Sequence, residues 1–223
     1  MTKKFALRAH CRQDEHPSRA ARLGTPLVCA PSDTWRVFCA IELPERIRGL
    51  VLSHINCLKE SVPDAKASWS RDANLHLTLK FLGEIPQTSV SLFSEAASRA
   101  AAGLTPFTIR LEQTGVFPKH GSPRVMWLGI NDVSGKLAEL HARLENEAAD
   151  AGFEKDGRPF HPHLTVARLR QPRHARPLAD AYKQTEFEPA EIAVSELLVI
   201  RSELSGEGSK YTVISRHELF GVR

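Results

Sequence analysis

The chain has 223 residues, of which 42% are hydrophobic and 25% charged, a composition typical of a folded globular protein. This length suits one domain or two small lobes around a real core. No apolar run approaches the roughly 18 residues that cross a bilayer, so no membrane association is expected. The formal net charge is only +4, which is weak support for binding long nucleic-acid tracts.

Most of this positive charge lies at the start of the chain. Residues 1–34 contain six Lys or Arg against three Asp or Glu and show no sustained hydrophobic period, so we expect a flexible basic extension. The folded domain is expected over residues 35–223. The four cysteines all fall in the first quarter without metal-like spacing, which predicts free thiols and a cytoplasmic location.

From Trp35 onward the chain alternates strand-like and helix-like segments. The apolar run WRVFCAIEL predicts a buried strand, and Pro44 suits the first turn of the helix that follows. Strands are expected over residues 35–43, 67–70, 76–83, 107–117, 124–130, 158–170, 191–202 and 210–219. Helices are expected over residues 44–59, 86–102, 133–151 and 177–185.

Two short segments share one pattern. HLTL (76–79) and HLTV (163–166) each carry a histidine and a threonine two positions apart. Because side chains alternate along a strand, His and Thr share one face while the apolar residues take the other. The two histidines are 87 positions apart, near half of the predicted domain, which indicates a diverged internal duplication. We therefore predict an α+β fold with two lobes, in which two mostly antiparallel sheets face a central cleft and helices cover their outer faces.

These segments carry a resemblance to a known family. With their flanks, HLTLKFLGE (76–84) and RPFHPHLTVAR (158–168) resemble the two-histidine phosphoesterases, specifically the RNA 2′,3′-cyclic phosphodiesterases, also called 2′–5′ RNA ligases. The opening strand and the closing hairpin LVIRSELSGEGSKYTVI support it, and the resemblance covers residues 35–219. It implies an enzyme that opens the 2′,3′-cyclic phosphate at an RNA 3′ end to a 2′-phosphate, and that in some members joins RNA ends. The sequence leaves the oligomeric state open, and a monomer is the default expectation.

The residue types suit this chemistry. One imidazole takes a proton from the attacking water and the other protonates the departing oxygen, so His76 and His163 are the candidate catalytic residues. The hydroxyls of Thr78 and Thr165 point into the same cleft and are candidate phosphate-binding groups. We prefer His76 as the acid and His163 as the base. No metal and no cofactor are required.

Two cationic residues near the tetrads are candidates for substrate binding. Lys80 lies on the face of His76 and Thr78 if the strand alternates regularly, although a lysine solvated at the rim explains the sequence equally well. Arg168 matches the arginine that closes the family motif, but strict alternation directs it away from His163, and only a bulge would return it to the cleft. Phe81 is expected to pack in the core rather than stack on a base.

Other functions agree less well with the sequence. A non-catalytic module that binds RNA ends needs neither histidine, and the chain keeps both. A two-histidine enzyme acting on a small cyclic nucleotide phosphate remains an alternative, because loops decide substrate size. A serine hydrolase is disfavoured because no G-x-S-x-G segment occurs, and a zinc site because the histidines lack ligand spacing.

Overall fold

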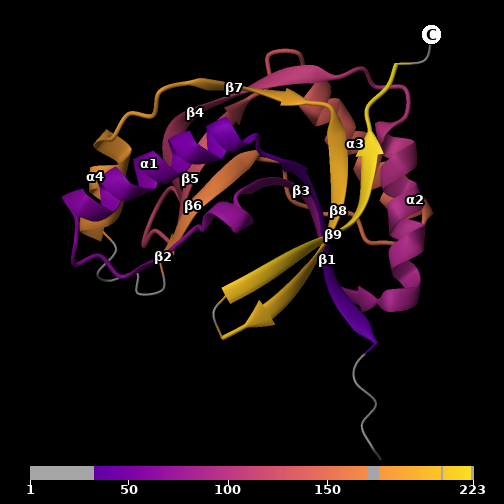
Figure 1. Cartoon of the computed structure of the whole chain (residues 1–223), viewed down its shortest axis with the longest axis horizontal. Helices are drawn as coiled ribbons and strands as arrows, with labels where there is room; N and C mark the ends of the chain where they lie inside the picture. Colours follow the sequence, from indigo (N-terminus) through magenta and orange to yellow (C-terminus); the bar gives the residue numbers. More distant parts are fainter. Residues whose placement is uncertain (1–32, 170–175, 207, 222–223) are drawn as a thin grey trace, which may run out of the picture. The chain divides into compact units, whose positions relative to one another are not determined.

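The computed structural model describes residues 33–169, 176–206 and 208–221 of the chain (Figure 1). The predicted basic extension therefore lies outside the described residues, except for its last two positions. Described helices are α1 (Glu45–Ser61), α2 (Val90–Ala101), α3 (Lys136–Asp150) and α4 (Arg176–Gln184), with short 3₁₀ turns at Asp72–Asn74 and Gln87–Ser89. Strands are β1 (Thr34–Glu42), β2 (Ala67–Trp69), β3 (His76–Pro86), β4 (Phe107–Phe117), β5 (Val125–Asn131), β6 (His163–Leu169), β7 (Ala190–Val194), β8 (Glu196–Ser205) and β9 (Gly208–Glu218).

The strands form two antiparallel sheets, which confirms the predicted α+β class. The first sheet has the order β3-β1-β8-β9, and the second sheet has the order β2-β6-β5-β4-β7. Each sheet thus contains one strand that begins at a motif histidine, β3 in the first and β6 in the second. The prediction that the two motifs belong to different sheets is confirmed.

Two helices pack away from the sheet whose strand precedes them in the chain. We call each sheet, with the helices that pack on it, one half of the domain. Helix α1 follows β1 of the first sheet but packs against α4, which contacts β4 of the second sheet. Helix α3 follows β5 of the second sheet but contacts β3 of the first, beside α2 (Figure 1). One buried apolar cluster includes residues from all four of these helices and from both sheets. The two halves therefore share a core.

Some predicted boundaries were wrong for local reasons. The strand expected over 191–202 is two strands, because the chain leaves the second sheet at Val194 and enters the first at Glu196. Only Ser195 and Glu196 interrupt its apolar residues there, which is too little to reveal the change of sheet. The strand expected over 158–170 begins only at His163, since Pro159 and Pro162 lack the N–H that a sheet uses.

Two further findings bear on the sequence predictions. Among the described residues, no helix is long and apolar enough to cross a membrane. Cys39 and Cys57, the two cysteines within the described part of the chain, are free thiols, as predicted.

Candidate active site

A cavity of about 550 Å³ lies between the two sheets and is lined by both pairs of motif residues. His76 and Thr78 reach it from β3, and His163 and Thr165 reach it from β6. We call this space the central cavity. Further lining residues include Arg36, Ser70, Arg158, Arg168 and Tyr211. The structure thus brings together the four residues that the alternation of the two tetrads predicts to face one cleft.

Both motif strands bulge at the residue that follows the threonine. On β3, Thr78 pairs with Ala40 and Lys80 with Cys39, so Leu79 is an extra residue. On β6, Thr165 pairs with Trp127 and Ala167 with Met126, which makes Val166 the extra residue. A bulge shifts the alternation of every following residue by one. The two halves therefore share this irregularity as well as the motif.

The bulge on β3 corrects the prediction for Lys80. Instead of sharing the face of His76 and Thr78, Lys80 is buried, with 4% of its surface exposed, and its Nζ lies 2.8 Å from a carboxylate oxygen of Glu145. It does not line the central cavity. Phe81 takes the cavity face in its place and is 50% exposed, so the prediction that Phe81 packs in the core is also wrong.

The bulge on β6 has the opposite consequence for Arg168. Its side chain lines the central cavity beside His163 and Thr165, as the sequence allowed only with a bulge. Ser70 binds the backbone at this bulge, because its N–H donates to the carbonyl of Val166 at 2.9 Å and its Oγ donates to the carbonyl of Thr165 at 2.7 Å. Strand β2 therefore fixes the bulge that returns Arg168 to the cavity.

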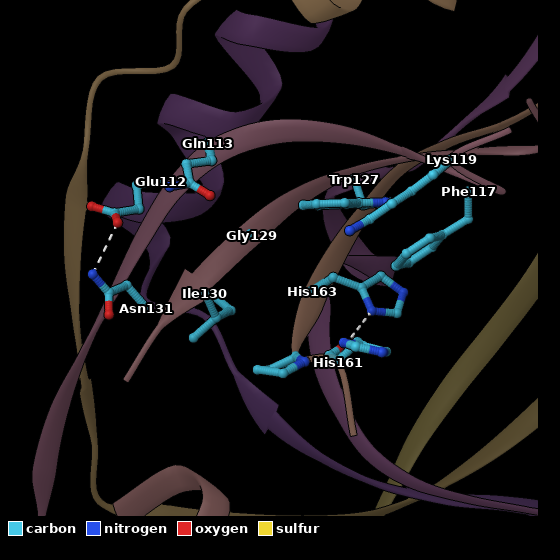
Figure 2. Close-up of a pocket in the computed structure, with 11 residues that line it drawn as sticks. Glu112, Gln113, Phe117, Lys119, Trp127, Gly129, Ile130, Asn131, His161 and His163 are labelled. Atoms are coloured by element: carbon cyan, nitrogen blue, oxygen red, sulfur yellow. Dashed lines mark hydrogen bonds between the residues drawn. The ribbon is translucent and has the colours of Figure 1, made fainter. Parts of the chain in front are cut away.

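The imidazole of His163 is held in one tautomer. Its Nδ1 lies 2.7 Å from the carbonyl oxygen of His161, and a carbonyl oxygen only accepts, so Nδ1 carries the proton (Figure 2). In the neutral ring Nε2 is then the free acceptor. Phe117 packs edge-on against the ring with centroids 5.2 Å apart. This contact and the Nδ1 hydrogen bond fix the orientation of His163.

Trp127 completes the frame around His163. Its indole packs 5.0 Å from the ring of Phe117 and 6.4 Å from His163. The indole lies over Gly115, where an added Cβ would stand 2.1 Å from the ring, so glycine is needed there. Together with Glu112, Lys119 and other residues these groups line a second cavity of about 500 Å³ beside His163 (Figure 2).

His76 lies among aromatic rings. The centroid of Phe38 is 4.7 Å away, and Tyr211 stands edge-on at 5.2 Å. Burial lowers the pKa of His76 to about 4; the backbone of Asn74 partly opposes this, and the charge of Arg168 adds to it. Nδ1 of His76 has no hydrogen-bond partner among the described residues, so its contact with the Asn74 backbone is weak. Free His76 is therefore neutral near pH 7.

The electrostatic setting of His163 is similar but less extreme. Desolvation lowers the pKa of His163; its hydrogen bond to the His161 carbonyl raises it, and the charge of Arg168 lowers it further. Arg168 therefore acts on both motif histidines. A positive charge that destabilises two imidazolium ions also provides a site for an anion between them.

The sequence missed Tyr211 and Arg36, which line the central cavity from β9 and β1. Tyr211 pairs with Ser202 on β8, and this pairing places both side chains at the cavity. Nothing in the local pattern of either strand distinguishes these residues from ordinary sheet residues. His161, which precedes Pro162, has a structural role, because its carbonyl orients His163.

Comparison with known proteins agrees with this geometry. The family model described as the 2′–5′ RNA ligase superfamily matches residues 45–206. The chain belongs to the 2′–5′ RNA ligase superfamily. One relative within it is the RNA 2′,3′-cyclic phosphodiesterase of Methanothermobacter thermautotrophicus, which is 33% identical over 178 residues that make up 79% of this chain and 95% of the relative.

Solved structures of similar proteins have the same fold. TT0787 of Thermus thermophilus superposes with a TM-score of 0.68 at 28% identity, over 84% of this chain and all of that chain. Escherichia coli LigT in complex with 3′-AMP gives a TM-score of 0.65 at 29% identity, over 84% of this chain and 99% of that chain. Within the described ranges, no three His, Cys, Asp or Glu side chains gather into a metal-binding group.

Proposed function

We propose that this protein is an RNA 2′,3′-cyclic phosphodiesterase that opens a terminal 2′,3′-cyclic phosphate to a 2′-phosphate by acid–base catalysis. The observation that carries this proposal is the pair of His-x-Thr strands, which face one cavity from two sheets and bulge at the same position. Relatives that share about 30% identity with most of the chain bear the name of this activity.

In this mechanism His163 is the base. Its Nδ1 proton is engaged by the His161 carbonyl, which leaves Nε2 to accept a proton from water. The water oxygen bonds to phosphorus as the bond from phosphorus to O3′ breaks. His76, on the opposite wall, protonates O3′. Nucleophile and leaving group thus lie on opposite sides of phosphorus, as an in-line displacement requires.

The acid must be charged before it acts. Because free His76 has a pKa of about 4, it needs an anionic partner to hold a proton near pH 7. The cyclic phosphate monoanion in the central cavity is that partner, since a negative charge beside the ring favours imidazolium. Substrate binding therefore prepares the acid.

The remaining lining groups stabilise the phosphoryl oxygens. The hydroxyls of Thr78 and Thr165 donate hydrogen bonds to the non-bridging oxygens, where negative charge grows in the transition state. Arg168 supplies a planar cation that matches phosphate geometry. All these groups come from one chain, so a monomer suffices and an RNA 3′ end with a cyclic phosphate is its partner.

The test is hydrolysis of a short RNA that ends in a 2′,3′-cyclic phosphate, in the presence of EDTA. We expect wild type to yield a 2′-phosphate end, and His76→Ala and His163→Ala each to lose about two or more orders of magnitude in kcat. His120→Ala is the matched control, because His120 is exposed and does not line the central cavity.

Three other outcomes would replace this proposal in part or whole. Binding of the RNA without ring opening would indicate a non-catalytic module. Opening of mononucleotide cyclic phosphates alone would keep the mechanism and change the substrate. Loss of activity in EDTA that zinc restores would contradict the metal-independent mechanism.

A further inference from the structure

A groove of about 430 Å³ adjoins the central cavity. It runs between the middle of β3 and residues 152–158, and its lining includes Leu82, Phe153 and Lys155. Phe81 and Arg158 line both the groove and the central cavity. The two spaces therefore meet at these two side chains, and a chain that leaves the central cavity has a path past them.

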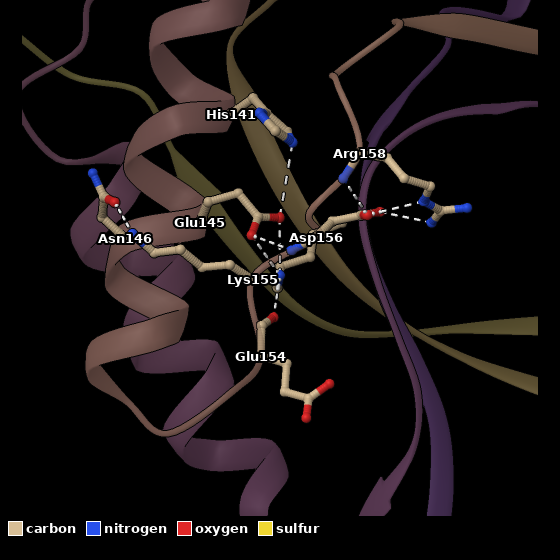
Figure 3. A network of polar contacts seen from close by, with 8 residues as sticks. His141, Glu145, Asn146, Glu154, Lys155, Asp156 and Arg158 are labelled. Atoms are coloured by element: carbon tan, nitrogen blue, oxygen red, sulfur yellow. Dashed lines mark hydrogen bonds and ion pairs between the residues drawn. The ribbon is translucent and has the colours of Figure 1, made fainter.

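Arg158 is held at this junction by a carboxylate. Its Nε and one terminal nitrogen donate to the two oxygens of Asp156 at 2.9 and 2.7 Å, and its backbone N–H also donates to Asp156 at 3.1 Å (Figure 3). The side chain is 85% exposed. A guanidinium has five N–H donors, so the carboxylate orients Arg158 and leaves donors free for a ligand.

The segment that carries Arg158 is anchored to the buried Lys80. The Nζ of Lys80 donates to both oxygens of Glu145, at 2.9 and 2.8 Å, and to the carbonyl of Glu154 at 2.8 Å. Glu145 in turn accepts the N–H of Asp156 at 3.0 Å. The lysine that was expected in the cleft thus fixes the backbone on both sides of residue 155.

The same segment then leads to the second motif. Phe160 stacks on His141 of α3, with centroids 3.8 Å apart and planes within 9°. His161 accepts the hydrogen bond from His163. Residues 154–161 are therefore attached to β3 and α3 at one end and to the candidate base at the other.

We propose that this groove holds the nucleotide immediately 5′ of the one that bears the cyclic phosphate, and that Arg158 binds the phosphodiester between the two. This inference rests on the proposed function. An RNA whose cyclic end lies between His76 and His163 continues only in the 5′ direction, and the groove opens from that cavity.

The charged residues that line the groove indicate that one side chain binds the phosphodiester, and not an overall positive potential. Three cations, Arg158, Lys155 and Lys80, line the groove, but so do the carboxylates of Glu154 and Asp156, and the charge of Lys80 is paired with Glu145. The groove is thus close to neutral, and its phosphate affinity comes from one oriented guanidinium. Such a site binds an RNA whose phosphodiester lies at the position of Arg158, and it adds little affinity for unrelated polyanions.

The experiment compares three substrates: a mononucleoside 2′,3′-cyclic phosphate, a dinucleotide with the same end, and that dinucleotide with a neutral methylphosphonate linkage. For wild type we expect kcat/KM to rise from the mononucleotide to the dinucleotide and to fall about tenfold with the methylphosphonate, the effect of one charge-assisted hydrogen bond. Arg158→Ala should lose the same factor on the dinucleotide and show no further loss with the methylphosphonate. Arg99→Ala is the control, because Arg99 is an exposed, ion-paired arginine on α2 that does not line the central cavity or the groove.

The outcomes separate this inference from the proposed function. If wild type opens the mononucleotide but gains nothing from the second nucleotide, the groove inference fails and the proposed function stands. If Arg158→Ala remains sensitive to the methylphosphonate, another residue binds the phosphodiester. If wild type opens none of the substrates, the proposed function itself fails.

A second variant tests whether the buried ion pair of Lys80 and Glu145 positions Arg158. Replacing both charges in Lys80→Met/Glu145→Leu avoids a lone buried charge while releasing Glu154 and Asp156. With folding verified by circular dichroism and a thermal melt, the ratio of kcat/KM for dinucleotide to mononucleotide should fall toward that of Arg158→Ala. Adding Arg158→Ala should then cause no further loss. An unchanged ratio would contradict the positioning role.

Discussion

Phe81 and Arg168 occupy equivalent places in the two halves of the central cavity. Each stands three residues after the threonine of its tetrad, and each faces the cavity because its strand bulges just after that threonine. One half thus offers an aromatic ring and the other a guanidinium. This asymmetry fits a ligand with a base at one side and a phosphate at the other, and it leads to the first prediction.

Removing the ring of Phe81 should weaken substrate binding rather than chemistry. The guanidinium of Arg36 lies 4.8 Å from the centre of this half-exposed ring, so the pair offers a flat surface to a base. Stacking of one base contributes about 1–3 kcal/mol, so we expect Phe81→Ala to raise KM about tenfold with little change in kcat. Steady-state kinetics will test this. Phe81→Tyr should restore KM, and Leu92→Ala, at an equally exposed position on α2, should leave it unchanged.

The two threonine hydroxyls should contribute mainly to kcat. Thr78→Val and Thr165→Val keep the shape of the side chain and remove the donor that faces the cavity. By analogy with other oxyanion donors we expect a loss of about a hundredfold in kcat for each, and near-normal activity for the serine variants. Equal loss in the valine and serine variants would indicate a packing role instead.

The buried His76 should make stability depend on pH. Its pKa is about 4 in the folded state against about 6.5 in the unfolded chain, so only the unfolded state gains the proton between these values. Stability should therefore fall as pH drops from about 6.5 to about 4, with a contribution on the order of 3 kcal/mol. Denaturant unfolding at several pH values measures it, and His76→Asn should show a shallower decline.

Nuclear magnetic resonance gives an independent check on the same residue. The imidazole of His76 should stay neutral until the pH falls below about 5. A nucleoside 2′-phosphate in the cavity should raise the pKa of His76. An unchanged value in the complex would contradict the idea that the substrate charges the acid.

Breaking the pair of Lys80 and Glu145 should strongly destabilise the protein. Lys80→Met leaves Glu145 buried without its cation, and such a change typically costs about 3–5 kcal/mol. Urea unfolding should show this loss, and Glu145→Leu in the same chain should recover most of it. Lys66→Met, at an exposed lysine, should change the free energy of unfolding by no more than about 0.5 kcal/mol.

The sequence predicted the parts of the site that follow from regular alternation. His76 and Thr78 precede the bulge on β3, and His163 and Thr165 precede the bulge on β6, so a period of two placed all four correctly. The errors begin one residue later, at Lys80 and Phe81. A bulge adds one residue without any sign in the local pattern, because both neighbours of the extra residue remain compatible with a strand.

The local sequence pattern also could not predict which residues of distant strands line the cavity. Tyr211 and Arg36 line the cavity only because β9 and β1 belong to the same sheet as β3, and sheet order is not written in any single strand. Likewise only Ser195 and Glu196 separate the apolar residues of β7 from those of β8, too short an interruption to reveal the change of sheet. The fold class was predictable from the repeated order of elements, whereas the pairing that completes the site depends on tertiary packing.

The packing of α1 and α3 bears on how this chain can be divided into fragments. A cut between β4 and β5 would separate α1 from α4 and α3 from β3, and it would divide the strand pairs β1–β8 and β4–β5. Neither fragment is then expected to fold alone, but the two should assemble when expressed together.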